Sequence, residues 1–134
     1  MLVAADDILI IAAPDLANLR NAKNLIDLLR ASRPNDRHPQ YCLNQVGVPK
    51  RPELKPADFT KALEAEPAAV IAFEPQMFGT AANNGQMIAE VAAGHRVAET
   101  FRQLAQLVTG RAEVKRAHGS LFAPLLGKLM RRQA

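Results

Sequence analysis

Three short apolar runs constrain the fold of this chain more than any other feature of the sequence. The first is Ile8–Ala13, with the sequence ILIIAA, and the others cover about Gln40–Val46 and Ala68–Phe73. Strands buried on both faces of a parallel sheet have this continuous apolar character, because helices cover both sides of such a sheet. We therefore predict three largely buried strands.

Helical patterns separate and follow the predicted strands. Asp15 is placed to cap a helix that runs to about Ser32, and further helices are expected over about Asp58–Ala65, Asn84–Val91 and His95–Val108. The last of these should turn four apolar side chains inward: Val97, Phe101, Leu104 and Val108. Alternation of strands and helices predicts an α/β fold with three layers, in which a parallel sheet of about three strands in the order 1-2-3 has flanking helices.

The first predicted strand lies at an edge of this sheet. Apolar edge strands normally have a partner, because their free backbone groups pair with any available strand. We expect either a second copy of the chain or further sheet beside Ile8–Ala13.

Length and composition fit one domain over residues 1–110 and a basic tail over residues 111–134. The single cysteine, Cys42, excludes an internal disulfide and fits a reducing compartment. A reducing compartment indicates a cytoplasmic protein. No apolar stretch approaches the roughly 18 residues of a spanning helix, so we expect that the chain does not cross a membrane. The net charge of +4 belongs to the tail, which has six basic residues and one acidic residue, against 11 basic and 12 acidic residues in the rest. A body of charge −1 argues against a nucleic-acid partner.

Several motifs resemble a known family. The segment AADDILIIAAPDLANLRNAKNLIDLL is similar to a strand–helix unit of MinD/ParA-type ATPases, and YCLNQVGVPKRPEL and FGTAANNGQMIAEV resemble the CpaE/TadZ branch, the pilus-assembly proteins of Flp/Tad-type secretion systems. The resemblance covers Leu2–Gly110 and implies the C-terminal half of a P-loop NTPase fold. It further implies a homodimer, formed through the sheet edge or the family interface, and pilus-assembly proteins as partners.

The same resemblance indicates what this chain lacks. Members of the family have a receiver-like domain and a phosphate-binding loop that would precede Met1, and no segment here matches G-x-x-x-x-G-K-[ST]. We therefore expect a part of a longer protein that does not hydrolyse ATP alone. The ATP and Mg²⁺ of the full-length family are not expected to be retained by this chain.

Candidate binding residues lie where the second and third predicted strands end. The Asn44 amide offers a donor and an acceptor that match the edge of adenine, and the resemblance places Glu74 and Pro75 at the other wall of the base pocket. The alternative is that Asn44 only caps a turn.

A small polar turn, Gly79–Gly85, is expected to open the helix that follows the third strand. Four of its residues are candidates near the nucleotide or a subunit interface: Thr80, Asn83, Asn84 and Gly85. The alternative is an ordinary Asn/Gly-rich helix start, because the turn contains no cation for a phosphate.

No catalytic or metal-binding constellation is predicted. Asp6 and Asp7 should point to opposite faces as neighbours in an extended segment, and the histidines are isolated in sequence. The charged, proline-rich stretch from Val48 to Pro56 is expected to be a solvated connection, with partner docking as the alternative.

The tail contains an amphipathic pattern. Apolar pairs recur every four residues beside basic ones, a pattern typical of helices that bind anionic lipid. The residues concerned are Leu121, Phe122, Leu125, Leu126, Lys128, Leu129, Met130, Arg131 and Arg132. They predict peripheral attachment to the inner membrane, with a tail folded back on the body as the alternative.

Two functions of different classes remain open from the sequence. One is a CpaE/TadZ-like fragment in pilus assembly that contributes the adenine side of a nucleotide site. The other is a flavodoxin-like protein-interaction module that assembles through its sheet edge and basic tail without a nucleotide.

Overall fold

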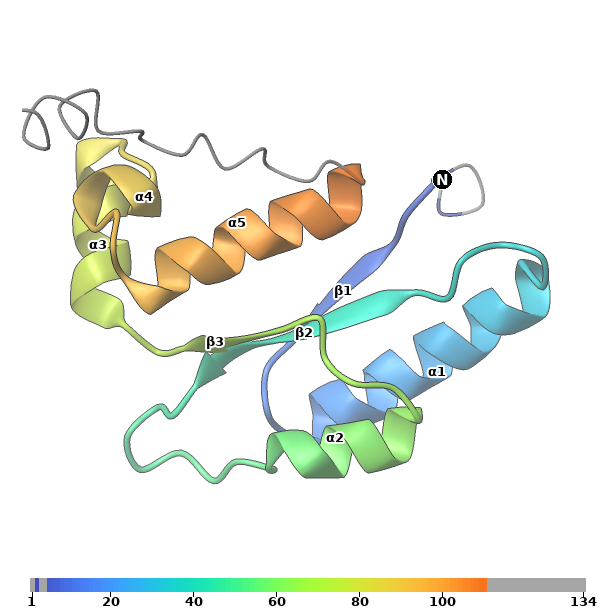
Figure 1. The fold of residues 1–134 in the computed structure, drawn as a ribbon. Helices are drawn as coiled ribbons and strands as arrows, with labels where there is room; N and C mark the ends of the chain where they lie inside the picture. The colour runs from blue at the N-terminus through green and yellow to red at the C-terminus, as the bar shows by residue number, and fades with distance from the viewer. Residues whose placement is uncertain (1, 3–4, 111–134) are drawn as a thin grey trace, which may run out of the picture.

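The computed structural model describes residue 2 and residues 5–110 of the chain. Within them a parallel sheet has the strand order β1-β2-β3, as predicted (Figure 1). The strands are β1 (Leu9–Ala12), β2 (Gln40–Val46) and β3 (Ala69–Ala72). Leu9 lies opposite Gln40 in the first pair, so both strands begin level with each other.

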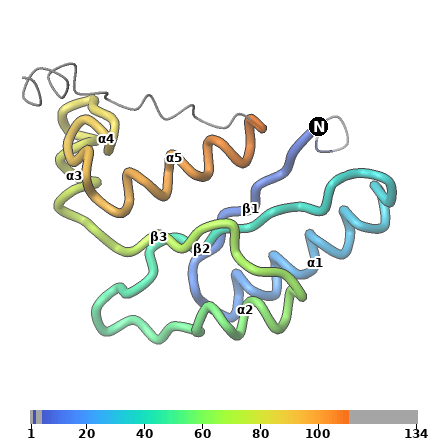
Figure 2. Tube along the Cα trace, viewed as in Figure 1, coloured from blue at the N-terminus to red at the C-terminus, as the bar shows by residue number. Residues whose placement is uncertain are grey.

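Helices cover both faces of the sheet and complete three layers (Figures 1 and 2). On one face lie α1 (Leu16–Ser32) and α2 (Pro56–Leu63). On the other face α5 (Arg96–Thr109) packs on β3, with α3 (Pro75–Asn84) and α4 (Ile88–Val91) beside it. In the described part of the chain, no helix has the length and apolar character needed to span a membrane.

The start of α1 confirms the predicted cap. Asp15 is extended, with φ −131° and ψ 166°, and its carboxylate accepts hydrogen bonds of 2.8 Å from the backbone N–H and the side-chain amide of Asn18. The backbone hydrogen bond from Asn18 is the main cause that lowers the pKa of Asp15. Such a cap satisfies a donor that the helix itself leaves without a partner.

Strand β2 supplies both halves of the core, because its successive side chains point to opposite faces. Tyr41 and Leu43 are buried with Phe59 under α1 and α2, and the Tyr41 and Phe59 rings stack with centroids 6.4 Å apart. Cys42 points the other way and is fully buried with Ile71 beneath α5. Burial raises the pKa of the Cys42 thiol, so this cysteine is a core residue and not a reactive one.

The predicted helix over Asn84–Val91 is partly wrong: Ile88–Val91 is helical, but Asn84 is the last residue of a separate helix. The chain forms α3 directly after β3, starting at Pro75, and ends it at Gly85 in the left-handed conformation, with φ 63°. Proline fits the first helical position because the N–H that it lacks has no partner there. The short α4 then contains the second half of the predicted helix.

The predicted inner face of α5 is partly wrong. Val97 and Leu104 are buried as expected, but Phe101 is 41% exposed and Val108 is 42% exposed. The helix packs on the edge strand β3, and a three-stranded sheet is too narrow to cover the whole apolar stripe. Part of that stripe therefore faces outward.

The apolar edge strand is present as expected. β1 pairs with β2 alone among the described strands, and Ile11, which points to the same face as Cys42, is 58% exposed because α5 packs on β3 rather than on β1. An apolar strand with a free edge normally lies against a partner strand.

Candidate functional site

A pocket of about 210 Å³ lies at the carboxyl ends of β2 and β3. It brings together the three predicted base-pocket residues, Asn44, Glu74 and Pro75. Asn44 comes from the end of β2, whereas Glu74 and Pro75 follow β3 and begin α3. The remaining lining consists of neighbouring residues: Gln45, Ala72, Phe73 and Phe78. The carboxyl ends of neighbouring parallel strands lie at the same end of the sheet. Asn44 and Glu74, about thirty positions apart in the sequence, therefore meet there.

Asn44 is half-buried and has hydrogen-bonding capacity left over. Its side-chain oxygen accepts a 2.9 Å bond from the backbone N–H of Gln45, which is the local turn contact that the alternative interpretation predicts. Within residues 5–110, its side-chain NH₂ group makes no hydrogen bond. The amide can therefore still donate two hydrogen bonds and accept one more.

The backbone beside Asn44 is strained. Gln45 has φ 56°, in the left-handed region, and the pairing between β2 and β3 shifts register between Leu43 and Val46. For a residue with a side chain, such a conformation costs on the order of 1–3 kcal/mol and persists only where the surroundings enforce it. The bulge separates the end of β2 from the regular ladder and presents Asn44 at the pocket.

An ion pair from the following loop holds this bulge. Arg51 donates from its guanidinium to the backbone oxygen of Gln45 and contacts the Glu53 carboxylate at 2.8 Å. Glu53 in turn accepts from the backbone N–H groups of Gly47 at 2.9 Å and Val48 at 3.0 Å. The side chains of Arg51 and Glu53 are only 28% and 17% exposed, so this part of the loop is an ordered structure rather than a solvated connection.

The charge of Glu53 is stabilised by these contacts. The hydrogen bond from the Gly47 N–H is the main cause that lowers the pKa of Glu53, and Arg51 adds to the effect. This pair was not predicted from the sequence. The sequence offers one signal for it, because Glu53 lies six positions after Gly47, and glycine is a residue that favours turns.

Glu74 also faces a second cavity, of about 330 Å³, that lies along β3 and the start of α5. There Nε2 of His95 is 3.9 Å from Oε1 of Glu74, and Nδ1 of His95 accepts a 3.2 Å hydrogen bond from the Val97 N–H. His95 is thus the cap of α5 and a neighbour of the candidate pocket. In the sequence this histidine is isolated, so no contact with Glu74 was predicted.

The predicted turn that opens a helix is not a turn. Thr80, Asn83 and Asn84 lie inside α3, and Gly85 ends that helix instead of preceding one. A ten-residue helix is about 15 Å long, so Asn84 lies at the far end of α3 from the pocket. The cause is Pro75, which starts the helix immediately after β3. These four residues do not supply helix-start N–H groups to a ligand.

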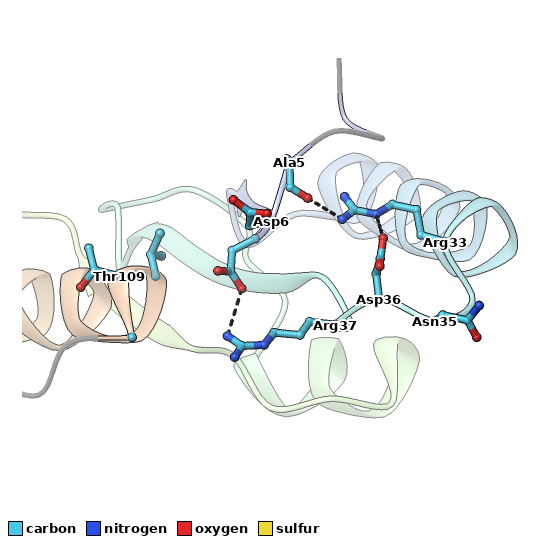
Figure 3. Close-up of a pocket in the computed structure, with 10 residues that line it drawn as sticks. Ala5, Asp6, Arg33, Asn35, Asp36, Arg37 and Thr109 are labelled. Carbon is cyan, nitrogen blue, oxygen red and sulfur yellow. Dashed lines mark hydrogen bonds and ion pairs between the residues drawn. The ribbon is translucent and has the colours of Figure 1, made fainter.

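A polar cavity of about 670 Å³ lies at the other end of the sheet, between the segment before β1, the loop after α1 and the end of α5 (Figure 3). Arg33 donates to the backbone oxygens of Leu2 and Ala5 there, and Asp7 lies 3.5 Å from Arg37. Asp6 and Asp7 are both exposed, as expected. Arg33 fastens the segment before β1 to the end of α1, which is a structural role.

Residues 5–110 and residue 2 contain no group of three or more His, Cys, Asp or Glu side chains that could hold a metal ion. The predicted lipid-binding residues of the tail, from Leu121 to Arg132, lie outside the described residues.

The fold is part of the fold of MinD/ParA-type P-loop ATPases, and this confirms the predicted fold class. The chain is similar to the MinC:MinD cell division protein complex of Aquifex aeolicus, with a TM-score of 0.65 and 22% identity over 83% of this chain and 46% of that one. It is similar to MinD of Pyrococcus horikoshii OT3 complexed with Mg-ADP, with a TM-score of 0.64 and 16% identity over 80% and 42%. For a ParA family ATPase of Chlorobium tepidum TLS the TM-score is 0.59, at 18% identity over 75% and 40%.

The chain spans less than half the length of these solved structures. No protein-family model matches it, and no curated protein has a matching sequence.

Proposed function

We propose that the chain is part of a CpaE/TadZ-like pilus-assembly protein, in which it contributes the adenine side of a nucleotide site. One observation supports this most strongly: Asn44, Glu74 and Pro75 come from two separate segments and line a single pocket. That pocket lies beyond the carboxyl ends of parallel strands, where open α/β sheets bind their ligands.

The chemistry of the pocket suits a purine base. The Asn44 NH₂ group and carbonyl oxygen can pair with the acceptor and donor that adenine presents side by side. Phe73, Pro75 and Phe78 supply apolar surface for the ring. The volume of about 210 Å³ is below the roughly 300–1,000 Å³ of sites for drug-sized ligands, so it fits a base and not a whole nucleotide.

The residues do not suit the phosphates or a magnesium ion. The sequence contains no phosphate-binding loop, and Glu74 is the one carboxylate that lines the pocket. In the proposal, a segment outside this chain supplies phosphate binding and any hydrolysis. This chain alone would have no ATPase activity.

Adenosine is the direct probe, because it lacks phosphates. We expect millimolar adenosine to shift the amide signals of Asn44, Phe73 and Phe78 in ¹⁵N NMR spectra of the full chain, and uridine to shift them less. Asn44→Ala should remove the response. Asn84→Ala is the matched control, since Asn84 is exposed at the far end of α3. Equal shifts with uridine, or an unchanged response in Asn44→Ala, would contradict base recognition.

Membrane placement is the second part of the proposal. At about 1 kcal/mol per basic residue near an anionic surface, one tail would bind weakly and two tails in a dimer far more strongly. Sedimentation with liposomes of increasing anionic lipid content, with and without residues 111–134, tests this. Binding that needs the tail and falls with salt is expected, and equal failure of both forms would remove the membrane role.

An interaction module without a nucleotide is the second candidate. The exposed β1 edge, with Ile11 58% exposed, favours it because an edge of this kind can pair with another copy. Self-association that depends on β1, together with no response to adenosine, would support this alternative.

A further inference from the structure

An apolar groove of about 530 Å³ lies between α3, α4 and α5 and shares Phe78 with the base pocket. Its walls include Ala81 of α3, Ile88 of α4 and Ala98 of α5. Phe78 and Phe101 form its aromatic floor, with ring centroids 6.2 Å apart in an edge-to-face arrangement. The groove is large enough for several apolar side chains.

Large apolar side chains of this groove remain exposed to solvent. Met87, between α3 and α4, is 67% exposed, and Phe101 is 41% exposed. Neighbouring exposed apolar residues that line a groove normally mark a binding surface, unlike single exposed ones. None of the residues that the structure describes fills the space between them.

We propose that the groove holds the segment Leu121–Met130 of this same chain. That segment presents three apolar pairs at a spacing of four residues, which form one stripe if the segment is helical: Leu121 with Phe122, Leu125 with Leu126, and Leu129 with Met130. The stripe would match an apolar groove between helices, which is a common way of binding an amphipathic segment.

The connection is long enough for this. Phe101 precedes Gly110 by nine residues, or about 13 Å along the axis of α5. Residues 111–120 can span roughly 33 Å when extended. The tail therefore reaches the groove without strain on the chain.

The charges favour the same arrangement. Residues 111–134 have a charge of +5, from six basic residues and one acidic residue, whereas residues 74–110 have three acidic and two basic residues. Glu90 and Glu99, both exposed, are adjacent in sequence to the lining residues Ala89 and Ala98. Glu99 already pairs with Arg102, which also lines the groove, so Glu90 is the carboxylate placed to meet Lys128 and the arginines that follow it.

Docking would regulate the tail. One apolar stripe cannot lie in the groove and in a lipid surface at the same time, so the groove would compete with the membrane. The docking itself is independent of the proposed function, but this consequence rests on the proposed lipid binding of the tail.

Disulfide formation in the full chain tests the docking. Met87→Cys combined with Leu126→Cys should form an intramolecular disulfide under mild oxidation. The control pairs Leu126→Cys with Leu28→Cys, because Leu28 is 65% exposed on α1, on the opposite face of the sheet. Leu28 is only five residues before Arg33, which lines the same cavity as Gly110, so an undocked tail would reach it as well. The buried Cys42 should not compete.

We expect the first pair to close at least tenfold faster than the control pair. Equal rates would overturn the proposal, because they indicate a tail without a preferred position. Disulfides formed only between chains would also overturn it and would assign the groove to a second copy.

Vesicle sedimentation tests the regulation separately. Met87→Glu should release the tail and raise the bound fraction at least threefold on vesicles of half anionic lipid, while Met87→Leu should behave like the unchanged chain. Failure of every variant to bind would remove the membrane role, and the disulfide result would still decide the docking. Binding that is identical in Met87→Glu and Met87→Leu would overturn the competition.

Discussion

Leu28 and Leu29 are neighbours on α1 with opposite environments, and they allow a stringent test of the fold. Leu28 is 65% exposed, whereas Leu29 is 4% exposed and borders a small cavity of about 30 Å³. Replacing either by alanine removes the same atoms from the same helix. Only Leu29→Ala should leave a hole, because only Leu29 points into the core.

The expected loss for Leu29→Ala is about 3 kcal/mol, within the roughly 2–5 kcal/mol seen for buried leucines. A domain of this size has about 5–15 kcal/mol of stability in total, so the variant should still fold. With a urea m-value of about 1.5 kcal/mol/M, the unfolding midpoint should fall by about 2 M. Leu28→Ala should change it by less than about 0.3 M, since alanine is an excellent helix former and no burial is lost.

Far-UV circular dichroism and tyrosine fluorescence are suitable probes for both variants. Tyr41 is the single tyrosine of a chain without tryptophan, and it is 1% exposed at the centre of the sheet. Similar unfolding midpoints for the two variants, or a larger loss for Leu28→Ala, would show that the Leu29 face of α1 does not point into the core.

Three further predictions concern the cap of α1, the loop after β2 and the edge strand β1. Asp15→Ala should cost about 1 kcal/mol of helix capping at pH 7. Because the pKa of Asp15 is lowered in the folded state, its contribution is present above the ordinary aspartate pKa and is lost as the pH falls through the folded value, so urea midpoints of the variant and the unchanged chain should converge in acid. Glu53→Gln should speed hydrogen exchange at the Gly47 and Val48 amides, because both amides donate hydrogen bonds to the Glu53 carboxylate. Unchanged exchange at these amides would contradict the role of Glu53 in the loop. Ile11→Lys should reduce self-association in analytical ultracentrifugation while shifting the unfolding midpoint by less than about 0.5 M, and undiminished association would show that the β1 edge is not the contact.

The strands and their order follow from the sequence, because the relevant signals are local. Continuous apolar runs identify strands buried on both faces, and helical segments between them require parallel pairing in the order found. The Asp15 cap and the end of α1 before Pro34 are equally local. The placement of Asn44, Glu74 and Pro75 at one pocket follows from the same logic, since parallel strands end at one side of a sheet.

Other features depended on the tertiary structure. Pro75 is compatible with either a turn or a first helical position, and only packing beside β3 determines that α3 starts there. The apolar stripe of α5 is wider than the sheet beneath it, so the sequence pattern could not show that Phe101 would remain outside.

The bulge at Gln45 had no sequence signal of its own. It exists because Arg51 and Glu53, six and eight residues later, fold back and supply hydrogen bonds that offset a strained backbone. A pattern of residues along the chain thus determined which segments are strands and helices, whereas contacts between those segments decided which polar groups are held at the pocket and which apolar ones are left exposed.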